Sequence, residues 1–234
     1  MSISPVNRQE ILAGHFLLRH LRPEELSRLA ATAVITHHTA NATIFQKGDP
    51  GSSMMAVVRG RVKICTYSAD GREFVLNIID QGGLFGEIAV LDGQTRSGDA
   101  VALEPTDLLV LERSRLLPFL TANPEIATRL IVVLCQRLRQ TSETLEDALL
   151  RDASARVARG LLRLAGTFGR PEGRNIRLDI RLSQQQIGNL IGISRETINK
   201  HIGDWSRAGF LSVQGGFITI SDREALEGLA EGEA

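Results

Sequence analysis

The stretch LSQQQIGNLIGISRETINKHIGDWSRAGF, residues 182–210, has the pattern of two short helices joined by a sharp turn. Ser183 and Ser194 each precede a helical run, and serine is a preferred N-cap because its hydroxyl accepts a hydrogen bond from an unpaired backbone N–H. Gly192 stands at the turn, where a left-handed residue ends the first helix most easily. The apolar positions expected to face inward are Ile187, Leu190, Ile191, Ile193, Ile198, Ile202 and Trp205. The stretch therefore predicts a helix-turn-helix.

The second helix of this pair has a polar outer face with groups suited to DNA. An arginine can bond guanine O6 and N7 together, and a carboxylate can accept from cytosine N4. Hydroxyl groups and helix N-termini hold phosphates. A structural helical hairpin with solvated charges is the alternative. The residues that we predict to bind double-stranded DNA are Ser183, Ser194, Arg195, Glu196, Thr197, Asn199 and Lys200.

The surroundings of the helix pair favour the DNA-binding interpretation. LSVQGGFITI follows it and predicts a β-hairpin folded on Gly215-Gly216, which would form a wing. Residues 153–220 carry 10 Lys and Arg against 4 Asp and Glu, a net charge of +6, although the whole chain is neutral. A basic region beside acidic ones indicates a polyanionic partner for that region.

Composition limits the remaining classes of protein. The 234 residues are 43% hydrophobic and 23% charged, as in globular proteins with one or two domains. No run approaches the ~18 apolar residues of a membrane helix, and the N-terminus lacks the apolar core of a signal peptide. Cys65 and Cys135 have no metal or redox spacing. We expect a cytoplasmic protein with no membrane partner and no metal.

The N-terminal half is expected to be mainly β. Residues 8–33 have helical periodicity, with a helix start at Pro23. Residues 34–113 then change to short strand-like runs separated by Gly, Asp and Pro turns. Regularly spaced short strands of this kind predict a sandwich, roll or barrel.

Residues 114–151 are helical throughout, with a long helix from about residue 124. A narrow apolar seam follows it at heptad spacing, which favours dimerisation over packing on the β domain alone. One seam position is polar: Thr141, with Ser142 beside it. The seam consists of Ile131, Leu134, Leu138, Thr141, Leu145 and Ala148.

The segment FGEIAVLDGQTRSG, residues 85–98, interrupts the strands and places Glu87 and Arg96 nine residues apart among small residues. A guanidinium matches two phosphate oxygens with a fork of donors. An Arg–Glu ion pair that stabilises a turn is the alternative.

This arrangement resembles the Crp–Fnr family of transcription regulators, which includes the cyclic AMP receptor proteins. The most specific pieces are FGEIAVLDGQTRS, QTSETL and IGNLIGISRETINK, and the likeness covers nearly the whole chain. It implies an α+β fold with a cyclic-nucleotide-binding β-roll (residues 1–123), a dimerisation helix and hinge (124–152) and a winged helix-turn-helix DNA-binding domain (153–234).

The resemblance also implies a ligand and its site. Cyclic AMP, or cyclic GMP, would bind with its phosphate on a phosphate-binding cassette and its ribose 2′-hydroxyl on Glu87. Arg96 would offset the charge of the Glu87 carboxylate. Thr141 and Ser142 would bond the purine from the two subunits, and Asp152 would cap a helix at the hinge. Ligand binding would order the dimer helices and reposition the DNA-binding domains. The cassette residues are Gly86, Glu87, Ile88, Ala89, Arg96 and Ser97.

Two departures from the family pattern affect specificity. Lys200 stands where a receptor protein has arginine, which removes a bidentate contact, and the cassette loop LDGQT is one residue shorter. The expected partners are a second copy of the chain and a roughly palindromic operator with half-sites about one helical turn apart. RNA polymerase is a further partner by analogy, through residues 166–175.

Other functions fit less well. Two distant cysteines cannot supply four iron–sulfur ligands, and the five histidines lack a haem motif. Adjacent His37 and His38 on a strand point to opposite faces, so a cupin-like metal site, and an enzyme, are not expected. Two alternatives stay open. One is a Crp–Fnr regulator that binds DNA without cyclic nucleotide or senses another effector. The other is a cyclic-nucleotide-binding regulatory module without DNA recognition.

Overall fold

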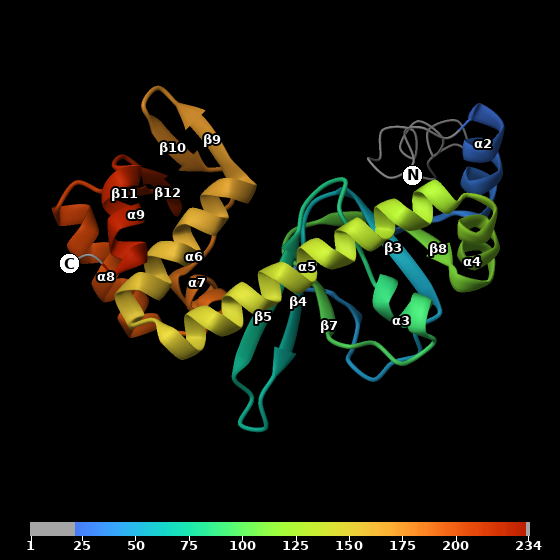
Figure 1. Cartoon of the computed structure of the whole chain (residues 1–234), viewed down its shortest axis with the longest axis horizontal. Helices are drawn as coiled ribbons and strands as arrows, with labels where there is room; N and C mark the ends of the chain where they lie inside the picture. The colour runs from blue at the N-terminus through green and yellow to red at the C-terminus, as the bar shows by residue number, and fades with distance from the viewer. Residues whose placement is uncertain (1–21, 233–234) are drawn as a thin grey trace. The chain divides into compact units, whose positions relative to one another are not determined.

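The computed structural model describes residues 22–232, which divide into two compact units. The first unit runs to Arg72 and continues over Leu76–Leu138, and the second contains Glu73–Val75 and the chain from Arg139 onward. The long helix α5, Pro124–Leu150, contributes to both (Figure 1). The division at residues 123 and 152 expected from the sequence stays a prediction.

The first unit is built on two four-stranded sheets, which confirms the predicted mixed fold with an N-terminal β domain. One sheet has the strand order β1 (Val34–His38), β8 (Thr106–Glu112), β3 (Ser53–Arg59), β6 (Leu84–Phe85). The other has the order β2 (Thr43–Phe45), β7 (Asp99–Ala102), β4 (Val62–Tyr67), β5 (Glu73–Ile79).

The core of this unit follows from the alternation of side chains along the strands. Leu108 and Leu109 are adjacent on β8, are both fully buried, and belong to two different apolar clusters. Leu108 packs with residues of both sheets, such as Val57 and Val62. Leu109 packs against the helices α2 (Pro23–Thr32) and α4 (Arg113–Ala122) and the first turns of α5. Strong burial on both faces of this strand explains its almost continuous apolar sequence.

The predicted helices agree with the observed ones where the structure describes them. α2 begins at Pro23, α4 and α5 cover the residues 114–151 that were expected to be helical, and the long helix begins at Pro124, close to the expected residue. The helix expected over residues 8–21 lies outside the described residues. Between residues 22 and 232, no single helix is long and apolar enough to cross a membrane; α4 and α5 pass that test only as a pair bent by 113°.

The second unit contains the helix-turn-helix and its wing, as predicted. Its helices are α6 (Ala153–Phe168), α7 (Gln184–Ile191), α8 (Arg195–Arg207) and α9 (Arg223–Glu231). A four-stranded sheet has the order β11 (Leu211–Gln214), β12 (Phe217–Ile220), β10 (Asn175–Leu178), β9 (Gly169–Glu172). α9 was not expected from the sequence.

Candidate functional site

The segment predicted as a phosphate cassette folds as a left-handed turn followed by a short helix, α3 (Glu87–Asp92). Gly86 precedes the helix with φ 79°, a conformation that favours glycine. A Cβ at this position would also lie 2.6 Å from Nη1 of Arg96. Glycine is therefore required at 86 both for its backbone conformation and for the close approach of the guanidinium.

Arg96 points into the domain and is only 4% exposed. Its Nη1 donates to the carbonyl oxygens of Ser53 at 2.7 Å and Gly86 at 3.0 Å, and its Nη2 donates to Oγ of Ser53 at 3.1 Å. Its Cζ lies 4.2 Å from the centre of the Phe45 ring. These contacts fix the guanidinium beside the turn at Gly86.

The positive charge of Arg96 has no ion-paired carboxylate among residues 22–232. Its Nε is buried without a hydrogen-bond acceptor. Burial lowers the pKa of Arg96, and the more distant charges of Asp49, Glu112 and Glu87 partly offset that effect. A buried cation of this kind suits an anionic ligand, because the anion supplies both the counter-charge and an acceptor.

Glu87, only 1% exposed, forms its ion pair with Arg137 of α5. Arg137 also donates from Nη2 to the carbonyl of Leu84, in the strand before the cassette. Arg137, and not Arg96, is therefore the ion-pair partner of Glu87, and Arg96 interacts with that carboxylate only at longer range. The sequence contained a signal for Arg137: it lies four residues before Thr141, on the same side of the helix one turn earlier.

The remaining predicted ligand residues differ in accessibility. Ala89 is buried, and its Cβ is 2.2 Å from the position that a Cβ on Gly51 would occupy, so the two segments are in close contact. Ile88 and Ser97 are exposed. Thr141 and Ser142 are exposed on α5. The structure therefore brings Gly86, Glu87, Ala89 and Arg96 together.

The helix-turn-helix has the caps expected from its sequence. Oγ of Ser183 accepts from the backbone N of Gln186, and Oγ of Ser194 accepts from that of Thr197 at 3.1 Å. Gly192 ends α7 with φ 75°. Ile187, Ile191, Ile193, Ile198, Ile202 and Trp205 are buried, whereas Leu190 is half-buried.

The predicted DNA-contacting side chains lie on the outer surface. Ser194, Arg195, Glu196, Asn199 and Lys200 are exposed, as is Ser183 at the start of α7, and Thr197 is half-buried. A hydrogen bond from its own backbone N–H, and then one from Ser194, lower the pKa of Glu196. Oδ1 of Asn199 accepts from the Gln184 side chain at 3.0 Å, which orients the amide. Asp152 caps α6 by accepting from the backbone N of Ala155 at 2.8 Å.

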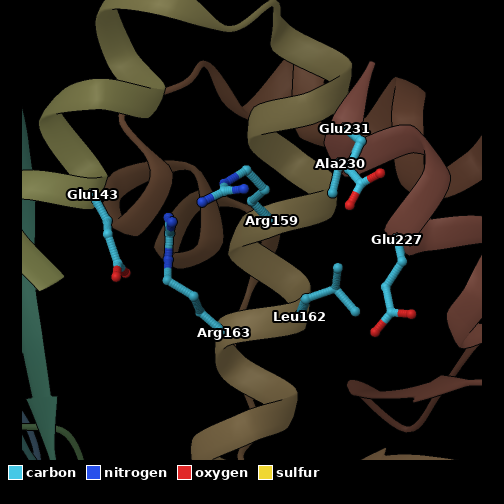
Figure 2. A pocket seen from close by; sticks show the side chains of 7 residues that line it. All are labelled: Glu143, Arg159, Leu162, Arg163, Glu227, Ala230 and Glu231. Atoms are coloured by element: carbon cyan, nitrogen blue, oxygen red, sulfur yellow. The ribbon is translucent and has the colours of Figure 1, made fainter. Parts of the chain in front are cut away.

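A cavity of about 410 Å³ lies elsewhere, between α5, α6 and α9 of the second unit. Figure 2 shows the guanidinium groups of Arg159 and Arg163 extending from α6 toward α5. Beside it, Asp147 of α5 is 3% exposed and ion-paired with Arg159, Arg163 and Arg151. Nη1 of Arg151 donates to the carbonyl of Ala230 on α9 at 2.8 Å. This network was not predicted, and it joins the end of α5 to α6 and α9.

Comparison with known proteins finds two family models that match this chain. Residues 35–123 match the family model of the cyclic nucleotide-binding domain, and residues 155–229 match that of the Crp-like helix-turn-helix domain. The chain is 34% identical to a CRP-like cAMP-activated global transcriptional regulator of Mycobacterium tuberculosis, over 93% of this chain and 97% of the relative.

Two further relatives support the same assignment. A Cyclic AMP receptor protein of Thermus thermophilus is 30% identical over 95% of this chain and 100% of its own length. The crystal structure of a CRP/FNR-family transcriptional regulator from the same species is similar, with a TM-score of 0.70 and 26% identity over 86% of this chain and 100% of that one. The chain belongs to the Crp–Fnr family: it is a DNA-binding transcription regulator with an N-terminal cyclic-nucleotide-binding domain.

Proposed function

We propose that the protein is a homodimeric regulator whose operator binding is controlled by cyclic AMP in the β domain. The observation that supports the ligand most strongly is the environment of Arg96. Its guanidinium is buried, has no ion-paired carboxylate among the described residues, and carries an Nε without an acceptor. A singly charged cyclic phosphate would supply two oxygens to this fork of donors.

The other cassette residues have complementary roles. Glu87 accepts the ribose 2′-hydroxyl, because a buried carboxylate would repel the phosphate but can accept from a hydroxyl. Arg137 orients the Glu87 carboxylate through their ion pair. Ser97 adds a hydroxyl to the phosphate, and the small side chains at 86 and 89 leave room for close approach.

The dimer is proposed from the exposed seam of α5. Ile131, Leu138 and Leu145 are 57%, 68% and 59% exposed, although they are large apolar side chains at heptad spacing. A contiguous apolar stripe of this kind is typical of a surface that another protein covers, and a second α5 covers it symmetrically. Thr141 and Ser142 then lie at the seam, where they bond the purine from the two subunits.

DNA recognition is proposed through α8 in the major groove. Arg195, Glu196 and Lys200 are exposed at its start and supply donors and an acceptor for base edges. A dimer reads two half-sites, so we expect a roughly palindromic operator. Ligand in the β domain favours one arrangement of the paired α5 helices and so of the two recognition helices, with Asp152 at the hinge.

Isothermal titration calorimetry tests the ligand, with cyclic AMP, cyclic GMP and 5′-AMP as separate titrants. We expect saturable heat with cyclic AMP and none with 5′-AMP, whose doubly charged phosphate lacks the cyclic ester. Cyclic AMP should also tighten binding to a duplex that the protein selects from a random pool. Operator binding that is the same with and without nucleotide, and no heat, would favour a Crp–Fnr regulator that senses another effector.

A further inference from the structure

The cavity between α5, α6 and α9 is lined by side chains of both charges. Arg159 and Arg163 of α6 form its positive side, and Glu143 of α5 and Glu231 of α9 contribute negative groups. In the view of Figure 2, the two guanidinium groups lie between the Glu143 and Glu231 side chains. All four residues belong to the second unit, so the cavity and the cassette of the β domain are in different units.

The arginines on the positive side are only partly neutralised. Their shared carboxylate, Asp147, is also ion-paired with Arg151, so three positive charges face one negative charge. Nε of Arg159 lies 2.7 Å from Oδ1 of Asp147, but the two atoms are not aligned as a hydrogen bond. In the described part of the chain the Arg159 guanidinium makes no hydrogen bond at all. Since the side chains of Arg159 and Arg163 stay 30% and 28% exposed, they retain N–H donors for a carboxylate ligand.

The glutamates of the lining differ in their partners. Glu143 and Glu231 are exposed and form no ion pair among residues 22–232. Glu227 also lines the cavity, but it is paired with Arg223, whose Nε lies 2.7 Å away. Two unpaired carboxylates would repel a phosphate or another purely anionic ligand, and the two arginines of α6 would repel a simple cation. The arrangement therefore suits a ligand that carries both charges.

The rest of the cavity wall is apolar. Leu162 of α6 is half-buried and Ala230 of α9 is buried, and both line the cavity with the charged groups (Figure 2). The volume of about 410 Å³ falls within the about 300–1,000 Å³ that is usual for small-molecule sites. An aliphatic group on the ligand would contact this wall.

We propose that the cavity binds a free α-amino acid with an aliphatic side chain. The carboxylate of the ligand accepts from Arg159 and Arg163, its ammonium is attracted by the two unpaired glutamates, and its side chain contacts Leu162 and Ala230. A ligand held in this way joins α5, α6 and α9, so its binding should raise Tm. The site is separate from the proposed nucleotide site, and its test requires neither nucleotide nor operator.

Isothermal titration calorimetry of the full-length protein tests the proposal with four separate probes. L-leucine carries both charges and the aliphatic group, isocaproate lacks the ammonium, isoamylamine lacks the carboxylate, and inorganic phosphate is purely anionic. We expect saturable heat with L-leucine, and affinities roughly 10- to 100-fold lower for isocaproate and isoamylamine, because each lacks one charge-assisted contact. No saturable heat with L-leucine, or phosphate binding as tight as that of L-leucine, would overturn the proposal.

A double variant locates the site. Glu143→Gln/Glu231→Gln removes both charges that attract the ammonium and leaves the ion pairs of Asp147 in place. It should bind L-leucine at least roughly 10-fold more weakly and isocaproate no more weakly than the wild type does, so the preference between the two probes is lost. Glu146→Gln, at an exposed glutamate of α5 that does not line the cavity, is the matched control and should keep the wild-type affinity. Unchanged leucine affinity in the double variant, or an equal loss in the control, would overturn the proposal.

Discussion

The substitution Arg96→Gln removes the proposed counter-charge of the ligand while keeping a shorter, polar side chain. A hydrogen bond to a charged group contributes about 1.5–3 kcal/mol, so a bidentate phosphate contact contributes about 3–6 kcal/mol. Cyclic AMP should therefore bind roughly 10²- to 10⁴-fold more weakly. The dissociation constant is measured by calorimetry, with operator affinity at saturating nucleotide as a second readout.

The same substitution should change stability much less. The carbonyl groups of Ser53 and Gly86 lose donors that Arg96 supplies at 2.7 and 3.0 Å, at a cost of about 1–2 kcal/mol. The removal of a buried, uncompensated charge offsets part of this cost. We expect Tm to fall by no more than several degrees, at about 2–4 °C per kcal/mol for a chain of this size.

The control variant Arg113→Gln separates loss of the ligand contact from loss of hydrogen bonds to backbone carbonyls. Arg113, which is half-buried, likewise donates to a cassette carbonyl, from Nε to that of Val90 at 2.7 Å. Arg113→Gln should therefore lower stability to a similar extent and leave the cyclic AMP affinity close to that of the wild type. If Arg96→Gln binds cyclic AMP as tightly as the wild type does, the phosphate site is not at Arg96.

Three further substitutions test other parts of the account. Leu138→Glu should convert the proposed dimer to a monomer in sedimentation equilibrium, because two carboxylates would meet where apolar side chains pack. A persistent dimer would place the interface elsewhere. Glu196→Ala should relax the preference at one base pair in a duplex-selection assay more than it lowers affinity overall, and a uniform loss would indicate a backbone role. Asp147→Asn should lower the free energy of unfolding by on the order of 2–4 kcal/mol, because three arginines, each only 26–30% exposed, lose their carboxylate partner. Glu143→Gln on the same helix should change the free energy of unfolding by less than about 1 kcal/mol. Equal losses of the two variants in chemical denaturation would contradict the buried-network argument.

The elements with strong local signals were predicted well from the sequence. Ser183, Ser194 and Gly192 each specify a helix end through their own chemistry, and the structure has both caps and the left-handed residue at these positions. The hairpin at Gly215-Gly216 was predicted on the same grounds. The family resemblance then supplied what local patterns could not, namely the choice of a roll among the possible β folds and the proposed phosphate-binding role of residues 85–98.

Interactions between distant segments were not predictable in this way. The ion pair between Arg137 and Glu87 joins residues 50 positions apart. The place of Arg137 one turn before Thr141 pointed to that arginine, but nothing in either local pattern specifies its partner. Asp147 likewise forms ion pairs with Arg159 and Arg163 of the following helix, α6. The helix α9 was not predicted because residues 221–234 are rich in acidic side chains, and this high charge drew attention away from two helix signals. These signals are the N-cap Asp222 and the apolar Leu226, which is buried in the structure.

The most direct measurement is a crystal structure of the protein with cyclic AMP. We predict the cyclic phosphate within about 2.7–3.1 Å of the Arg96 guanidinium, the ribose 2′-hydroxyl on Glu87, and Thr141 within reach of the purine at a two-fold axis. A nucleotide bound in the β domain with its phosphate on other residues, and with Arg96 still bonded only to Ser53 and Gly86, would contradict the account.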